Sequence, residues 1–228
     1  MKVMKEGFKS SLAVSAGYLA VGIAFGLSAV QNQISWIWAV LMSLLVYAGS
    51  LQFAGIGLIV QGAGPLQVMI LSLAVNLRHI FYGFSFLREF GERGLRRLYL
   101  IFGLTDETYG LLCQKKAEEK NQPQLYFWIS LFDQLWWIIG TLLGAGAGLI
   151  LPFSTQGIDF AMTALFFVSC LDQLKTGSSS LPSLIGLFCS IAALILFGAQ
   201  GMIIPSLFLI LLCLILFRKK ITGGLDHE

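Results

Sequence analysis

Charged side chains are scarce in this sequence. Lys, Arg, Asp and Glu together make up 12% of the 228 residues, whereas a soluble globular chain carries about 25%. Hydrophobic residues make up 57%, so too little polar surface remains to cover a water-soluble body of this size. The composition excludes a soluble domain and predicts that lipid is the solvent for most of the chain.

Motifs of common catalytic and metal sites are also missing. The four cysteines have no C-x-x-C spacing and lie in or beside apolar runs, which excludes a disulfide framework or a zinc site. There is no H-E-x-x-H, no G-x-S-x-G and no P-loop. We therefore predict no enzyme activity, no metal and no cofactor, and an ion gradient as the energy source. The cysteines are Cys113, Cys170, Cys189 and Cys213.

Long apolar stretches fill the sequence instead. A membrane-spanning helix needs roughly 20 mostly apolar residues. We predict an all-α integral membrane protein with seven to eight transmembrane helices, some interrupted, in one permease domain over 1–228 and with no cleaved signal peptide. The last two predicted spans are short and could form a hairpin. The spans are 8–30, 34–60, 64–87, 96–113, 124–151, 157–175, 180–199 and 201–218.

Basic residues cluster at the ends of these spans. The net charge is only +3, so we interpret the clusters as topology signals and not as a nucleic-acid site. In an eight-span arrangement the clusters around Lys5, Lys115 and Lys219 share one side, which we assign to the cytoplasm together with both termini. The arginine-rich loop 88–97 would then lie outside, against the rule. Either that loop is outside or a neighbouring segment is re-entrant, and the sequence leaves both open.

The predicted span 64–87 contains polar residues that lipid does not tolerate. Asn76, Arg78 and His79 follow about a dozen largely apolar residues, so they lie at membrane depth. An arginine at the centre of a spanning helix costs about 2.5–3.5 kcal/mol unless it faces protein or water. Arg78 therefore needs a carboxylate, which either the substrate or the protein could supply.

A pair of carboxylates lies in the predicted span 96–113. Asp106 and Glu107 are adjacent and have apolar residues on both sides. A carboxylic acid in surroundings of low dielectric constant can exchange a proton near neutral pH, so both are candidates for proton coupling. Alternatively, the span is short enough for both to lie near one membrane surface. Asp133, beside two tryptophans in the next span, is a third candidate, and any of the three could pair with Arg78.

The predicted span 34–60 combines a polar stripe with glycines. Ser43, Tyr47 and Ser50 recur at helical spacing, and Gly49 lies near the middle of the segment. An interrupted helix there would free backbone groups to bind a charged ligand. Alternatively, the glycines only allow close packing between helices.

Glycines spaced four apart mark the first and the fifth predicted spans. Such stripes let helices approach closely, so we predict that they pack within the chain or against a small membrane partner. The two stripes, with similar sequences at 130–135 and 169–174, leave an internal repeat open. The glycines are Gly22, Gly26, Gly140, Gly144 and Gly148.

Five segments of the chain together resemble one known family. They are Gly-Ile-Ala-Phe-Gly at 22–26, Tyr-Ala-Gly-Ser-Leu-Gln-Phe-Ala at 47–54, Asn-Leu-Arg-His-x-x-Tyr-Gly at 76–83, Thr-Asp-Glu-Thr-Tyr at 105–109 and Asp-Phe-Ala-Met-Thr-Ala-Leu-Phe at 159–166. In this order they look like the AzlC family of branched-chain amino acid permeases, over nearly the whole chain. One departure is Ala24, where the family often has proline.

The resemblance implies the large subunit of a two-component exporter. Its partner would be a small multispanning AzlD-type protein, and together they would export leucine, isoleucine, valine and some analogues. The chain would then lie in the inner membrane of a bacterial cell. The direction of transport comes from the resemblance alone.

A branched-chain amino acid is a zwitterion with an apolar side chain. We expect Arg78 to bind its carboxylate, and Asp106 or Glu107 to bind its ammonium group. A channel, or an intramembrane enzyme with Asp106 and Asp133 as paired carboxylates, remains as an alternative. The candidate substrate-binding residues are Arg78, Asn76, His79, Tyr47, Gln52, Phe53 and Phe25, with the two phenylalanines against the apolar side chain. The candidate coupling residues are Asp106, Glu107 and Asp133.

Overall fold

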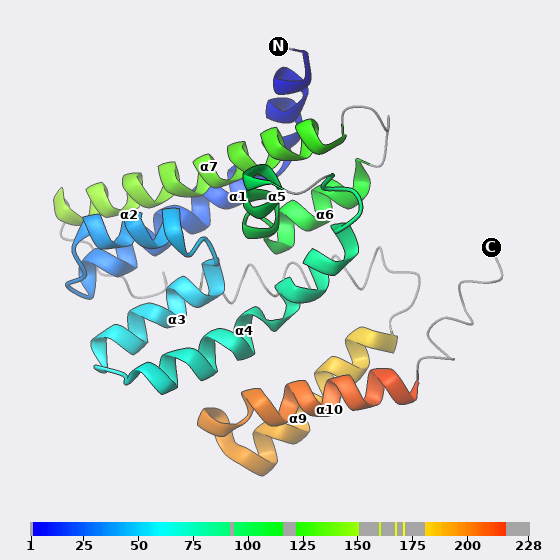
Figure 1. The fold of residues 1–228 in the computed structure, drawn as a ribbon. Helices are drawn as coiled ribbons and strands as arrows, with labels where there is room; N and C mark the ends of the chain where they lie inside the picture. Colours follow the sequence, from blue (N-terminus) through cyan, green and yellow to red (C-terminus); the bar gives the residue numbers. More distant parts are fainter. Residues whose placement is uncertain are drawn as a thin grey trace. The chain divides into compact units, whose positions relative to one another are not determined.

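A computed structural model describes residues 2–91, 94–115, 122–150, 160, 167, 171 and 181–217, and no strand occurs among them (Figure 1). The chain divides into two compact units, Met1–Met162 and Thr163–Glu228. The helices of the first unit are α1 (Lys2–Gln31), α2 (Trp36–Leu45), α3 (Gly49–Val60), α4 (Pro65–Phe86), α5 (Leu95–Phe102), α6 (Asp106–Gln114) and α7 (Gln122–Ile150). Those of the second unit are α9 (Leu181–Gly201) and α10 (Ile203–Leu216). The single permease domain remains a prediction.

The two longest helices, α1 and α7, lie side by side along most of their length (Figure 1). Gly7 lies against Trp128 near the start of both helices, and Gly148 lies against Val30 near the end of both. The two helices are therefore parallel. If both cross the membrane, they cross in the same direction, and the chain between them returns an odd number of times.

Glycines bring this helix pair into backbone contact. A Cβ atom at Gly26 would lie 2.1 Å from the Thr141 carbonyl oxygen, and one at Gly144 would lie 2.0 Å from that of Ile23. No real side chain fits at such distances. Both glycine stripes thus face each other inside the chain, and a partner subunit would have to contact other surfaces.

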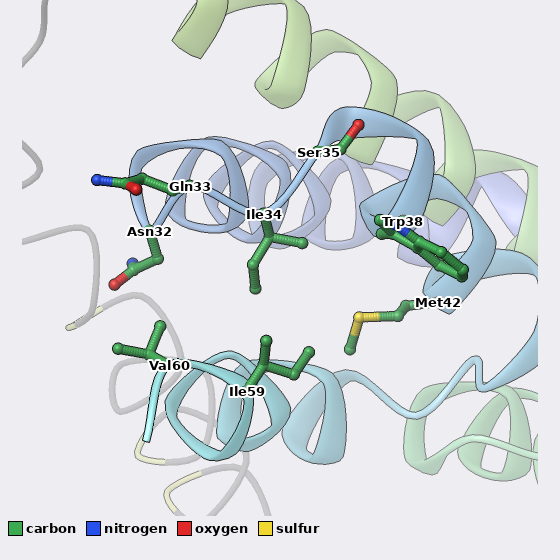
Figure 2. Close-up of a pocket in the computed structure, with 8 residues that line it drawn as sticks. All are labelled: Asn32, Gln33, Ile34, Ser35, Trp38, Met42, Ile59 and Val60. Atoms are coloured by element: carbon green, nitrogen blue, oxygen red, sulfur yellow. The ribbon is translucent and has the colours of Figure 1, made fainter. Parts of the chain in front are cut away.

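Helices α2 and α3 fold back on each other as a first hairpin. Ser35 and Met42 at α2 line one cavity with Ile59 and Val60 of α3 (Figure 2). In one unbroken helix Ser35 and Val60 would lie about 38 Å apart. The chain reverses at 46–48, and both ends of the hairpin lie next to the end of α1.

Helices α5 and α6 form a second hairpin with its turn at 103–105. Arg96, near the start of α5, lies 5.7 Å from the ring centre of Phe127. Leu112, near the end of α6, packs in one core cluster with residues of α7 between 125 and 129. Both ends of this hairpin therefore lie next to the start of α7.

The turns of the two hairpins meet halfway along α7. Gly49 of the first hairpin faces the Trp137 ring, and Gly103 of the second faces Ser130. Residues 130 and 137 are about 10 Å apart along a helix. The rings of Tyr47 and Phe102 lie 6.0 Å apart, so the turns contact each other. The hairpins thus enter from opposite ends of the α1–α7 pair.

Helix α4 runs antiparallel to α1 and α7. It begins five residues after Val60, close to the end of α1, and Phe86 at its own end lies 5.8 Å from Tyr126 near the start of α7. A long helix followed by a hairpin therefore occurs twice, in opposite directions. Inverted repeats of this kind are common in transporters. The sequence similarity pairs α1 with α7 instead, and its second segment, 169–174, lies largely outside the described residues.

Among the described helices three, α1, α7 and the first part of α9, are long and apolar enough to cross a membrane. Helix α4 is a fourth if its two parts, bent by 46°, count as one span. The segments predicted as spans 34–60 and 96–113 are hairpins, because turns at 46–48 and 103–105 reverse the chain. The described parts of loop 88–97 thus lie at the same end of the α1–α7 pair as the start of α1. This agrees with the alternative in which a segment next to the loop is re-entrant. The predicted span 157–175 lies largely outside the described residues.

The part of the second unit that the structure describes is mainly a pair of antiparallel helices, α9 and α10. The Sγ atoms of Cys189 in α9 and Cys213 in α10 lie 3.7 Å apart. Gly198 has a φ of 70° and is non-helical, so it bends the end of α9. The last two predicted spans, 180–199 and 201–218, thus correspond to a hairpin of two helices.

Candidate functional site

Arg78 of α4 joins both hairpins. Its Nη1 lies 2.8 Å from Oδ2 of Asp106, and its Nη2 donates a 2.9 Å hydrogen bond to Oγ of Ser50. Ser50 lies in the first turn of α3, and Asp106 is the first residue of α6. The exposed fractions of the Arg78 and Asp106 side chains are 34% and 32%. The ion pair is therefore accessible and could exchange partners.

Two helix N-termini face this ion pair. Helix N-termini carry partial positive charge because their first N–H groups lack partners within the helix. Thr105 caps α6 by accepting a 3.2 Å hydrogen bond from the Thr108 backbone, whereas Ala48 offers α3 no side-chain cap. Together with Arg78, the two N-termini favour an anionic group, and Asp106 fills that position here.

A fully buried carboxylate lies deeper, on α7. The exposed fraction of Asp133 is 0%. Its Oδ2 accepts a 2.8 Å hydrogen bond from Thr108 Oγ1, and its Oδ1 has no hydrogen-bond partner among the described residues. Tyr47, at the turn of the first hairpin, is also buried and close enough to Asp133 to interact electrostatically. The two hairpin turns thus enclose this carboxylate.

Hydroxyl groups connect Asp133 to Glu107. Thr105 Oγ1 donates to Thr108 Oγ1 over 3.1 Å. The hydroxyl of Tyr18 lies within hydrogen-bond distance of Thr105 Oγ1 and of Glu107 Oε2, the latter at 3.3 Å, and its one hydrogen serves one of these bonds at a time. The predicted coupling residues therefore fall into two groups: Asp106 pairs with Arg78, while Asp133 and Glu107 share a buried network.

Gln52 braces the first hairpin against α7. Its Nε2 donates to Ser43 Oγ over 3.0 Å, and its Oε1 accepts from Trp137 Nε1 over 3.1 Å. Ser43 is in turn hydrogen-bonded to Thr141 at 2.8 Å. Both polar ends of Gln52, a predicted substrate-binding residue, are thus occupied within the protein.

Aromatic rings pack against one another on the helices next to this network. Phe25 of α1 is fully buried, with its ring centre 5.5 Å from that of Phe53 and 6.3 Å from that of Trp137. On α4, the ring of His79 lies 5.7 Å from that of Tyr82. Of the predicted residues, Arg78, Asp106 and Tyr47 thus lie at the hairpin turns, while Phe25 and Phe53 form an apolar group beside the first turn.

Asn76 lies two residues before Arg78 on α4. Its Oδ1 is buried without a hydrogen-bond partner among the described residues. It is therefore a buried polar group with unused hydrogen-bonding capacity, on a different face of α4 from Arg78.

Three residues of the buried network, Tyr18, Thr105 and Thr108, were not among the predicted candidates. Tyr18 precedes Gly22 and Gly26 at spacings of four, so this periodicity already places it on the face of α1 that meets α7. Thr108 belongs to the segment 105–109 but has an uncharged side chain. A search for charged groups at membrane depth therefore overlooks it.

Helical hairpins that meet around an ion pair, in a chain with helices long enough to span a bilayer, are typical of membrane transporters. The model of the AzlC protein family matches residues 13–151. The chain therefore belongs to the AzlC family. No solved structure matches it.

Similar proteins come from several bacteria. The branched-chain amino acid transport protein AzlC of Bacillus subtilis is 34% identical over 218 residues, covering 95% of this chain and 86% of that protein. An uncharacterized membrane protein of Helicobacter pylori strain J99 is 37% identical over 224 residues, covering 97% of each. The inner membrane protein YgaZ of Escherichia coli is 29% identical over 182 residues, covering 76% of this chain and 74% of that protein.

Proposed function

We propose that this chain is the large subunit of a secondary transporter that exports leucine, isoleucine and valine across a bacterial inner membrane. An ion gradient drives it, and a small AzlD-type membrane subunit completes it. The observation that carries the proposal is the accessible Arg78, bonded at once to Ser50 and Asp106 at the two hairpin turns. The name of the Bacillus subtilis relative supports the substrate class.

The carboxylate of the amino acid replaces Asp106 at Arg78. A guanidinium binds carboxylates with two parallel hydrogen bonds, and the N-termini of α3 and α6 add favourable charge. Asp106, once released, accepts the ammonium group of the same substrate. The binding of a zwitterion therefore replaces the ion pair between Arg78 and Asp106 by two ion pairs between the protein and the substrate, and no charge is left unpaired.

The apolar side chain lies towards Phe25 and Phe53. These rings lie beside the first hairpin turn, and an apolar group there displaces no polar partner. A hydrophobic pocket discriminates only weakly between side chains that differ by one methylene group. One site of this kind therefore serves leucine, isoleucine and valine together.

The hairpins act as the two gates of the path. They enter from opposite ends of the α1–α7 pair, and Arg78 holds both turns through separate nitrogens. When the substrate takes Asp106 from Arg78, the second hairpin loses its contact while the first keeps Ser50. Because only the second hairpin is released, the path opens at one end only, as alternating access requires.

We place both termini in the cytoplasm. In this arrangement α1, α4 and α7 cross the membrane, and the hairpins enter it without crossing. The seven to eight spans expected from apolar length are then reduced by two, and the remaining number depends on residues 151–217.

Exchange of labelled leucine in vesicles that contain the chain and its small partner subunit tests the substrate. We expect saturable exchange that isoleucine and valine inhibit, but not 3-methylbutylamine or 4-methylpentanoic acid, which each lack one charge of the zwitterion. Vesicles without the partner should show none. Inhibition by either singly charged analogue, or full exchange by the solitary chain, would contradict the respective part of the proposal.

A pair of variants tests the site. Arg78→Ala should abolish exchange while the protein still inserts, because Asp106 then has no counter-charge and the substrate has no carboxylate partner. Arg96→Ala is the matched control: it also removes an arginine, but one that contacts the Phe127 ring at the start of α5. Normal leucine exchange by Arg78→Ala would refute the assignment.

A further inference from the structure

Asp133 is surrounded by acids. The titratable groups that face it are Tyr18 of α1, Tyr47 of the first hairpin turn, Tyr99 of α5 and Glu107 of α6. Each of these becomes negative when it ionises. Among the described residues the ion pair found is that of Arg78 with Asp106, and no described lysine, arginine or histidine lies within ion-pair distance of Asp133.

A charged Asp133 would therefore be a buried anion without a counter-ion. Its side chain has no exposed surface, and Oδ1 accepts no hydrogen bond from the described residues. Isolated charges are too costly in such surroundings. A bound proton removes the charge and makes that oxygen a potential donor.

A metal ion suits this position less well. Hard cations in proteins take about six oxygen ligands, whereas Thr108 already donates its hydroxyl hydrogen to Asp133. The described residues contain no cluster of three or more His, Cys, Asp or Glu side chains able to hold a metal. A proton needs only one acceptor.

The hydroxyls between the two carboxylates form a continuous path. From Glu107 it passes through Tyr18 at 3.3 Å and on to Thr105. From Thr105 it continues to Thr108 at 3.1 Å and to Asp133 at 2.8 Å. Each hydroxyl can donate one hydrogen bond and accept another. The Glu107 side chain is partly exposed, so the path leads from an accessible carboxylate to a fully buried one.

We propose that the hydroxyls of Tyr18, Thr105 and Thr108 conduct a proton between Glu107 and Asp133. In the forward step, protonated Glu107 gives its proton to the Tyr18 oxygen. Each hydroxyl releases its own proton to the next oxygen, and Asp133 receives the last one. One O–H bond breaks and one forms at each hydroxyl, Glu107 becomes a carboxylate and Asp133 a carboxylic acid.

The relay is the step of the transport cycle at which the ion gradient acts, and this assignment rests on the proposed function. Glu107 is adjacent to Asp106, which pairs with Arg78. The proton thus enters next to the proposed substrate site and is stored between the hairpin turns. Transfer itself needs no substrate and can be measured separately.

Time-resolved infrared spectroscopy of the chain with its small partner subunit in vesicles, after a rapid rise in pH, tests the relay without any amino acid. A carbonyl band of a protonated carboxylic acid, absent from Asp133→Asn, should disappear quickly in the unmodified protein. Thr108→Val should lose the band much more slowly, since valine has the same shape but no hydroxyl, and Thr108→Ser should restore the fast rate. Thr141→Val removes a buried threonine hydroxyl of α7 outside the relay, and in this variant the band should disappear as quickly as in the unmodified protein.

Three results would overturn the proposal: no band assignable to Asp133, an unchanged rate in Thr108→Val, or an equal slowing by Thr141→Val. Tyr18→Phe interrupts the same path from α1 and provides the test if Thr108→Val does not assemble. With leucine present, Thr108→Val should keep exchange across equal gradients and lose uphill transport. Wild-type protein that moves no leucine would refute the proposed function and leave the infrared test of the relay valid.

Discussion

Arg78 donates through two different nitrogens to two different hairpins. This arrangement depends on the planar fork of the guanidinium, which holds Ser50 and Asp106 in fixed directions. A lysine ammonium group has the same charge but is a single point at the end of a flexible chain. The geometry of the side chain is therefore separable from its charge.

We expect Arg78→Lys to insert normally but to export poorly. Loss of one hydrogen bond to a charged group costs about 1.5–3 kcal/mol, so leucine efflux should fall about tenfold or more. Efflux of labelled leucine from loaded vesicles gives the measurement, and Arg96→Lys, at a surface arginine, is the control. Efflux equal to that of the unmodified protein would show that only the positive charge matters.

At the scale of the helices, the α1–α7 contact determines where the site residues and the two hairpin turns lie. Tyr18 and Asp133 belong to these two helices, and both hairpin turns contact the middle of α7. The contact is tight because glycines bring one backbone against the other. A side chain at such a position must move the whole helix.

We expect Gly144→Leu to prevent assembly of the folded chain. Its Cβ would lie 2.0 Å from the Ile23 carbonyl oxygen, so the cost exceeds the roughly 1–3 kcal/mol typical of an overfilled core. Gly146, two residues away, has no atom within 4 Å of such a Cβ, and Gly146→Leu should be tolerated. The yield of monodisperse protein in mild detergent is the measurement. Equal yields of the two variants would contradict the parallel α1–α7 contact.

Helix positions could be predicted from the sequence, whereas the reversal of the chain could not. Apolar length identified α4, α7, α9 and α10 with ends one or two residues from those observed, whereas α1 begins six residues before the predicted start at residue 8. The segment 34–60 is also apolar over enough residues to span, and hydropathy alone does not distinguish one crossing helix from two halves folded back. The first reversal occurs at Tyr47, which has a φ of 44°, a conformation that sequence patterns assign to glycine.

The candidate site was predictable as far as it consists of charges. Arg78, Asp106 and Asp133 were identified because ionisable groups at membrane depth are costly. Which carboxylate pairs with Arg78 depends on contacts between α4 and α6, and these depend on the second hairpin. The hydroxyls of Tyr18 and Thr108 carry no charge, so only their three-dimensional contacts show their relation to Asp133.

For the whole molecule, the two hairpins change the sides on which the loops lie. With the start of α1 in the cytoplasm, the loop after α3 lies outside and the loop before α5 lies inside. The arginines of loop 88–97 then join the basic residues near the N-terminus, in agreement with the positive-inside rule. An arrangement with a full span at 34–60 and at 96–113 gives the opposite side for both loops.

Single cysteines in a cysteine-free background decide between the two arrangements. A membrane-impermeant maleimide added to intact cells should label Gln61→Cys, whereas Arg88→Cys should react only after the membrane is permeabilised, since the hairpins return the chain to the side it came from. Asn32→Cys and Lys5→Cys are controls, because both arrangements place residue 32 outside and residue 5 inside. All four side chains are exposed in the structure. Labelling of Arg88→Cys in intact cells, with Gln61→Cys protected, would show that both segments cross the membrane and that the inverted pair of hairpins is wrong.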